Sequence, residues 1–262
     1  MHPILMTKSF RSIGAVIAAT VAGVLLGACG TSDGGDPLAP TGPTGRVRFV
    51  NVITDTTRGR VNAILESVPF GVNLTYTQST PITLPAPNTA NYSPIYAGNR
   101  TLVLRRTVDT NTVVSTIAFT VAAGQDQTIY AAGGAGASAI TSFITTDDNT
   151  LSATQARVRV VHLSPTAGPV DVFVTAVGAD LAVATPTLSN VPVRTASAYL
   201  AVNPGTYQVR VVPAGTPPAS RAGAVAINVS SLAVAANTVR TIVAADNNVG
   251  GAPLRAFVLL DR

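Results

Sequence analysis

Short runs of alternating apolar and polar residues fill the chain after residue 45. Near residue 160, Val158, Val160 and His162 fall on one face of an extended segment, and Arg157 and Arg159 fall on the other, because successive side chains of a strand point to opposite faces. Similar runs recur between turns rich in Gly, Pro and Asn, and none shows a capped helical stripe. The pattern predicts about seven short strands per hundred residues, as in antiparallel immunoglobulin-like or prealbumin-like β-sandwiches.

The same pattern occurs twice along the chain. Arg46–Val50 recurs as Arg157–Val161, and the segment 119–133 aligns without gaps with the segment 232–246. The distance along the chain between the two copies is too long for one turn of a solenoid and suits one domain per copy. In this alignment Asn51 occupies the position of His162.

We therefore expect two sandwich domains, copy one at residues 46–147 and copy two at residues 156–262. The polar stretch around Asp147-Asp148-Asn149 separates them. It resembles a calcium-ligand cluster only faintly, because no loop with the spacing of an EF-hand follows. We expect a solvated linker there.

The N-terminus has the pattern of an export signal. Lys8 and Arg11 precede an apolar run that ends in Leu26-Gly27-Ala28-Cys29, and the run is short for a transmembrane helix. These four residues resemble the bacterial lipobox, with an ordinary signal peptide as the alternative. The resemblance implies a signal peptide over 1–28, followed by a lipidated, palmitate-bearing Cys29 and a flexible linker over 29–45. Gly30 after the cysteine favours the outer membrane by analogy with bacterial sorting.

Charge and composition narrow the choice of partners. The formal charge is +5 from 17 basic and 12 acidic residues; removal of Lys8 and Arg11 with the signal leaves 15 against 12, which is +3. The remaining arginines form no stripe, so nucleic-acid binding is not expected. Tryptophan is absent and tyrosines number six, which disfavours a carbohydrate-binding module that stacks sugars on aromatic rings. The lone cysteine excludes an intramolecular disulfide.

Catalytic or metal-binding candidates gather only in copy two. His162, Ser164 and Asp171 could form a hydrolase triad, but Pro165 ends the strand that would align the first two side chains. A zinc site needs three or four ligands, which these residues do not supply, so neither a metal nor another cofactor is expected. We favour a structural role, in which His162 at the strand end bonds to the next loop, and keep the three residues as a possible binding loop.

A family resemblance rests on the opening of copy two. Arg157-Val-Arg-Val-Val-His-Leu-Ser-Pro165, followed by Pro169-Val-Asp-Val-Phe173, resembles the bacterial family called domain of unknown function 4397. Copy one carries a weaker form, with Asn62 at the position of Asp171. The family usually has an acidic residue where this chain has Thr166. The resemblance implies an exported, often lipid-anchored sandwich protein and brings no activity with it.

Together these features predict a non-catalytic, lipid-anchored protein of the cell envelope, held in the membrane through Cys29. Its sandwich domains would serve as a binding or spacer module. The alternatives are an accessory module that binds an envelope polysaccharide or a partner protein, and a hydrolase that uses Ser164, His162 and Asp171.

Overall fold

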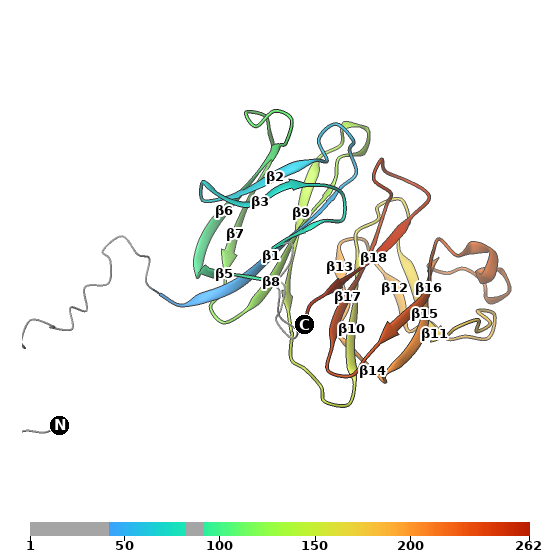
Figure 1. The fold of residues 1–262 in the computed structure, drawn as a ribbon. Helices are drawn as coiled ribbons and strands as arrows, with labels where there is room; N and C mark the ends of the chain where they lie inside the picture. Colours follow the sequence, from blue (N-terminus) through green and yellow to red (C-terminus); the bar gives the residue numbers. More distant parts are fainter. Residues whose placement is uncertain (1–41, 82–91) are drawn as a thin grey trace, which may run out of the picture. The chain divides into compact units, whose positions relative to one another are not determined.

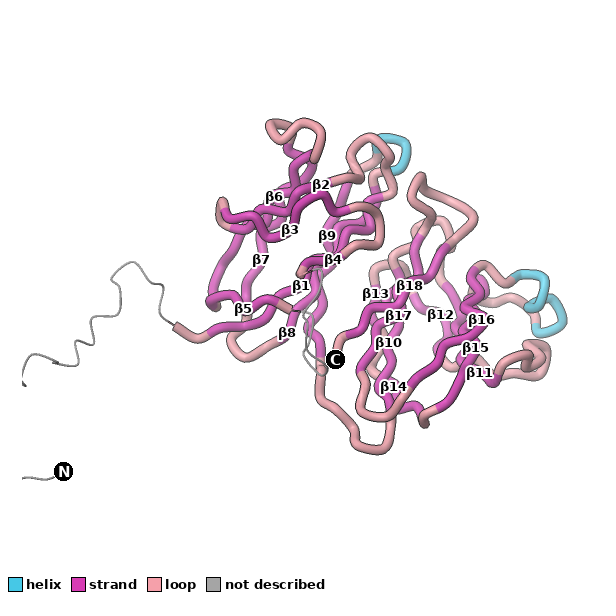
Figure 2. Tube along the Cα trace, viewed as in Figure 1, coloured by secondary structure: helices cyan, strands magenta, loops and turns pink. Residues whose placement is uncertain are grey.

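The computed structural model describes residues 42–81 and 92–262. Strands make up 55% of it and helices 4%, and Figure 2 shows strands throughout with only short helical turns. The predicted all-β sandwich class is confirmed. The predicted signal peptide, Cys29 and most of the linker lie outside the described residues, so the expectations about export and lipidation stay predictions.

Copy one forms two sheets from strands β1 to β9, all of them labelled in Figure 1 except β4, which Figure 2 labels. One sheet has the order β4-β1-β8-β9, with β5 also paired to β1, and the other has the order β3-β2-β6-β7. The bounds are β1 (Thr44–Ile53), β2 (Val61–Leu65), β3 (Val68–Leu74), β4 (Ser79–Thr80), β5 (Ser93–Tyr96), β6 (Gly98–Arg106), β7 (Val113–Val121), β8 (Asp126–Gly133) and β9 (Ile140–Asp147), with the short helix η1 (Ala135–Ala137) between the last two.

Copy two repeats this plan strand for strand. Its sheets have the orders β13-β10-β17-β18, with β14 also paired to β10, and β12-β11-β15-β16. The bounds are β10 (Ala156–His162), β11 (Val170–Ala176), β12 (Leu188–Val191), β13 (Thr195–Ala196), β14 (Leu200–Val202), β15 (Gly205–Pro213), β16 (Ile227–Val234), β17 (Val239–Ala245) and β18 (Arg255–Leu260), with the helix η2 (Pro218–Ala224) between β15 and β16.

Each copy also contains one parallel strand pair within its otherwise antiparallel sheets. β1 runs parallel to β8, and β10 runs parallel to β17. Alternation of apolar and polar residues reports which face a side chain takes and not the direction of the neighbouring strand. The expectation of wholly antiparallel sheets needs this correction.

The core of each sandwich lies between its two sheets. In copy one, Val61, Ala63 and Leu65 of β2 pack with residues of β1, including Val47 and Phe49. The matching core of copy two contains Val158 and Val160 of β10, on the face that the alternation predicts. The inward face of β10 therefore follows the sequence pattern.

A third apolar cluster joins the copies. Val50, Val52 and Tyr130 of copy one pack with residues of copy two, Val161 and Val243 among them. The face of β1 turned away from its own sandwich core is thus covered by the equivalent face of β10. Each sheet of the described chain draws its strands from one copy, but residues 42–262 form one compact unit. The proposed division into two domains stays a prediction.

Candidate functional site

The most elaborate polar arrangement lies in this shared face and begins at Arg48 on β1. The Arg48 side chain is 1% exposed, and its Nη2 atom lies 2.6 Å from Oδ1 of Asp261, which follows β18. Within its own copy Arg48 donates to Oγ1 of Thr128 on β8, with distances of 3.2 Å from Nε and 2.9 Å from Nη2. Nη1 also reaches the carbonyl oxygen of Leu260 at 3.3 Å.

Arg159 on β10 repeats this arrangement from the other side. Its side chain is 2% exposed and pairs with Oδ1 of Asp147 at the end of β9. Its Nε donates to Oγ1 of Thr241 on β17 at 2.8 Å, and its Nη1 reaches the carbonyl oxygen of Thr146 at 3.3 Å. Each arginine therefore binds the threonine of its own copy and the aspartate of the other.

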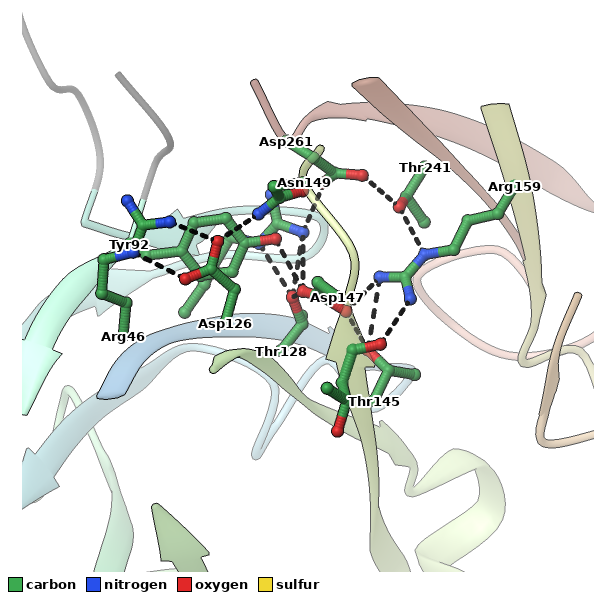
Figure 3. Close-up of polar contacts among 12 residues, drawn as sticks. Arg46, Tyr92, Asp126, Thr128, Thr145, Asp147, Asn149, Arg159, Thr241 and Asp261 are labelled. Atoms are coloured by element: carbon green, nitrogen blue, oxygen red, sulfur yellow. Dashed lines mark hydrogen bonds and ion pairs between the residues drawn. The ribbon is translucent and has the colours of Figure 1, made fainter. Parts of the chain in front are cut away.

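The threonines close these contacts into a ring, shown in Figure 3. Thr128 donates to Oδ2 of Asp147, and Thr241 donates to Oδ2 of Asp261 at 2.5 Å. We call Arg48, Thr128, Asp147, Arg159, Thr241 and Asp261 the interface ring. Two guanidinium and two carboxylate groups balance its charge, and contacts of residue i with j and of j with i mark a pseudo-two-fold interface.

Aromatic residues cover the ring on both sides. The Tyr92 hydroxyl donates to Oδ2 of Asp147 at 2.6 Å, and the Arg48 guanidinium carbon lies 4.5 Å from the centre of the Tyr92 ring. Arg159 lies 4.9 Å from the Tyr199 ring centre in the matching position. Such contacts add cation–π attraction where water is excluded.

Burial sets the electrostatics of the ring. Burial raises the pKa of the Asp261 carboxyl, and Arg48 opposes that shift. Burial, the largest single effect, would lower the pKa of Arg48, but Asp261, Tyr92, Tyr130 and Asp147 together outweigh it, so the pKa of the guanidinium is raised. Arg48 therefore stays charged, and removal of either acid would leave a buried guanidinium without its hydrogen-bonded carboxylate.

Asp147 corrects the expectation of a solvated linker. Asp147 and Asn149 are 4% and 6% exposed, and Asn149 donates to Oδ2 of Asp126 at 2.6 Å. Only Asp148 fits the expectation, with a side chain 56% exposed beside Arg157. The sequence signal that could have identified the ring is the repeat itself, since both copies carry arginine, threonine and aspartate at matching places.

Asn51 and His162 take equivalent structural positions, as the sequence predicts. His162 is fully buried and its Nε2 donates to the carbonyl oxygen of Gly168 at 2.7 Å. Asn51 is fully buried too, and its Nδ2 donates to the carbonyl oxygen of Gly59 at 2.6 Å. In each copy this side chain lies within the last three residues of the strand and holds the loop that follows. Burial lowers the pKa of His162 against the effect of the Gly168 carbonyl, which favours a neutral ring.

The possible binding loop of copy two is filled by its own hydrogen bonds. The Ser164 hydroxyl donates to Oδ1 of Asp246, and the Thr166 hydroxyl donates to Oδ2 at 2.7 Å. Nδ1 of His162 accepts from the backbone N–H of Ser164 at 3.5 Å, so neither ring nitrogen faces the serine hydroxyl. Oδ1 of Asp171 accepts from the backbone N–H of Asn190 at 2.8 Å. These contacts do not assemble the hydrolase triad.

Within residues 42–81 and 92–262, no three His, Cys, Asp or Glu side chains lie close enough together to hold a metal ion. No helix of that part of the chain is both long and apolar enough to span a membrane.

The paired sheets, the shared apolar face and the interface ring define an all-β protein built from two fused sandwiches. Residues 45–173 match the family described as Domain of unknown function (DUF4397), and this part of the chain belongs to that family. The match covers all of copy one and only β10 and the start of β11 in copy two, although we expected the stronger match in copy two. No curated protein matches the chain.

Proposed function

We propose that this chain is a non-catalytic, lipid-anchored protein of the cell envelope whose two sandwiches act as one rigid binding or spacer module. The observation that carries the proposal is the interface ring. It is charge-balanced, buried and shared by both copies, so relative motion of the copies would expose or unpair its charges.

The energetics favour a positioning role for the ring. A buried ion pair adds little net stability, because desolvation offsets the attraction between the charges. A shifted arrangement would leave buried guanidinium groups unpaired, which is strongly unfavourable. The ring therefore fixes how the apolar faces meet, while the apolar contacts supply the stabilising burial. A fixed pair of sandwiches suits a spacer that holds its loops at a constant distance from the anchor.

Attachment is tested by the change Cys29→Ala in the full chain. We expect the wild type to fractionate with membranes and to begin at a lipid-bearing Cys29 in mass spectrometry. The variant should be soluble, or uncleaved in the inner membrane. Normal processing of the variant together with unchanged membrane fractionation would contradict the anchor.

A polysaccharide-binding role is the second candidate. Two adjoining cavities lie among loops at one end of the molecule, with polar side chains in both. Partner-protein binding remains an alternative within the same module, and co-purification of one stoichiometric envelope protein would favour it.

A further inference from the structure

The loop between β1 and β2 lines two cavities, and their chemistry differs from that of the matching loop in copy two. One cavity of about 380 Å³ is lined by residues 54–58 with Gly136 and Val249, and the other, of about 220 Å³, is lined by parts of the same loop with Tyr76 and Asn248. Asp55 and Thr56 line both, so the two cavities adjoin. Loops from both copies contribute, which the interface ring makes possible.

Three threonine hydroxyls of this cleft are unused. Thr54, Thr56 and Thr57 donate no side-chain hydrogen bond to any residue of the described chain. In copy two, by contrast, Asp246 accepts from both Ser164 and Thr166. The two loops differ in sequence, because Ile53, Asp55 and Gly133 of copy one stand where Ser164, Thr166 and Asp246 stand in copy two.

The charge of the cleft is positive. Asp55 is neutralised locally, since its Oδ2 lies 2.6 Å from Nε of Arg58, and its Oδ1 accepts the backbone N–H groups of Thr57 and Arg58. Arg60 lines the smaller cavity, and its guanidinium has no ion-pair or hydrogen-bond partner among residues 42–81 and 92–262. One carboxylate against two guanidinium groups leaves a net charge of +1.

Apolar surface completes the cleft. Val249 is 56% exposed at the larger cavity. Tyr76 lines the smaller one, and its hydroxyl already donates to the backbone carbonyl oxygen of Asp246. Burial, helped by Asp246, raises the pKa of Tyr76 to about 12, so the ring stays neutral at physiological pH. The Val249 side chain offers contact to the C–H face of a ligand.

We propose that this cleft binds an acidic oligosaccharide. Free threonine hydroxyls exchange hydrogen bonds with sugar hydroxyls, and Arg60 matches a sugar carboxylate, which a planar guanidinium recognises with two hydrogen bonds. A few placed polar groups beside apolar surface are typical of ligand cavities. The inference rests on the binding role proposed above and names its ligand class.

The test measures binding of the full chain, in detergent, to three polymers by affinity electrophoresis and calorimetry. Polygalacturonate is the acidic sugar, dextran the neutral sugar and polyglutamate the acidic polymer without sugar. We expect polygalacturonate to bind best, and Arg60→Gln to weaken its binding about tenfold or more, as for loss of a hydrogen bond to a charged group. The double change Thr56→Ala with Thr57→Ala should weaken it too, at exposed positions where folding is not at risk.

The matched control is Arg100→Gln, which removes the same charge. Arg100 donates to the carbonyl oxygen of Tyr96 at 2.8 Å, and Tyr96 pairs with Thr44 at the far end of β1 from the cleft. Equal weakening by Arg60→Gln and Arg100→Gln would overturn the proposal, as would equal binding of dextran or polyglutamate, or no binding of polygalacturonate. Those results leave the anchored, rigid module standing, because membrane fractionation of the Cys29→Ala variant and thermal unfolding test it separately.

Discussion

The two copies are alike at the interface ring and differ in the loops after β1 and β10. In the ring, both copies supply arginine, threonine and aspartate, and each arginine binds the threonine of its own copy and the aspartate of the other. In the loops, Asp246 of copy two accepts from the Ser164 and Thr166 hydroxyls, whereas the hydroxyls of residues 54, 56 and 57 in copy one donate to no residue of the described chain. A pseudo-symmetric interface requires matching residues from both partners, while a loop at the solvent edge does not.

Removing one acid of the interface ring should have the largest effect on the free energy of unfolding. Asp147→Ala leaves the Arg159 guanidinium buried without its carboxylate, and the free energy of unfolding should fall by about 3–5 kcal/mol. Urea denaturation measures it. Asp148→Ala, one residue away, removes an exposed pair with Arg157 and should cost less than about 1 kcal/mol. Similar losses of unfolding free energy in the two variants would mean that burial of the ring does not increase the cost of unpairing its charges.

Replacing both members of one buried ion pair by apolar residues tests whether the ring acts by positioning the two copies. Arg159→Met combined with Asp147→Leu removes both charges at once, so no buried ion remains unpaired. The double variant should be more stable than Asp147→Ala alone, because replacement of a buried pair by apolar groups is often neutral. A double variant less stable than Asp147→Ala would contradict the positioning role of the ring.

The loop after β10 in copy two depends on hydrogen bonds to Asp246, whereas the loop after β1 in copy one has no equivalent acid. Asp246→Ala removes the acceptor of Ser164, of Thr166 and of the Gly251 backbone N–H, and should lower the free energy of unfolding by about 3 kcal/mol. Asp246→Asn keeps an acceptor and should lose less. Faster amide hydrogen exchange in residues 164–168 of the alanine variant would report the loosened loop, and unchanged exchange there would count against this account.

The equivalence of Asn51 and His162 predicts which substitutions copy two tolerates. His162→Asn places the copy-one residue in the copy-two slot and should leave the melting temperature nearly unchanged. His162→Leu leaves the Gly168 carbonyl without its donor and should cost about 1–3 kcal/mol. Equal stability of wild type and both variants would remove the structural role of His162.

The smallest expected effect is the pH dependence due to His162. Its pKa is lowered in the folded chain by burial, so below the ordinary histidine value of about 6.5 the unfolded chain binds a proton that the folded chain does not. Stability should therefore fall as the pH drops from about 6.5 through the lowered folded pKa. His162→Asn should lack this part of the profile, and superimposable pH profiles of the two proteins would contradict it.

Much of the fold could be predicted from the sequence, because the core obeys a period of two. Alternation correctly placed Val158 and Val160 inward, and the repeat correctly matched Asn51 with His162. It could not reveal the parallel pairing of β1 with β8, since the direction of a neighbouring strand leaves no mark on alternation.

The interface ring could not be predicted from the sequence for a similar reason. Arginines on the outer face of a strand show the same pattern whether water or another sheet covers them, and Asp147 stands beside Asp148 in a polar stretch typical of a linker. The cleft could not be predicted from the sequence either, because unused hydroxyls can be recognised only when their neighbours in space are known.

The interface ring requires the two copies to unfold as one unit, and differential scanning calorimetry of the full chain tests this most directly. A ring shared by both copies predicts a single cooperative transition whose calorimetric enthalpy equals its van't Hoff enthalpy. Asp261→Ala should move that whole transition to lower temperature, because Asp261 of copy two holds Arg48 of copy one. Two separate transitions in the wild type, with only one of them shifted by Asp261→Ala, would contradict the rigid module.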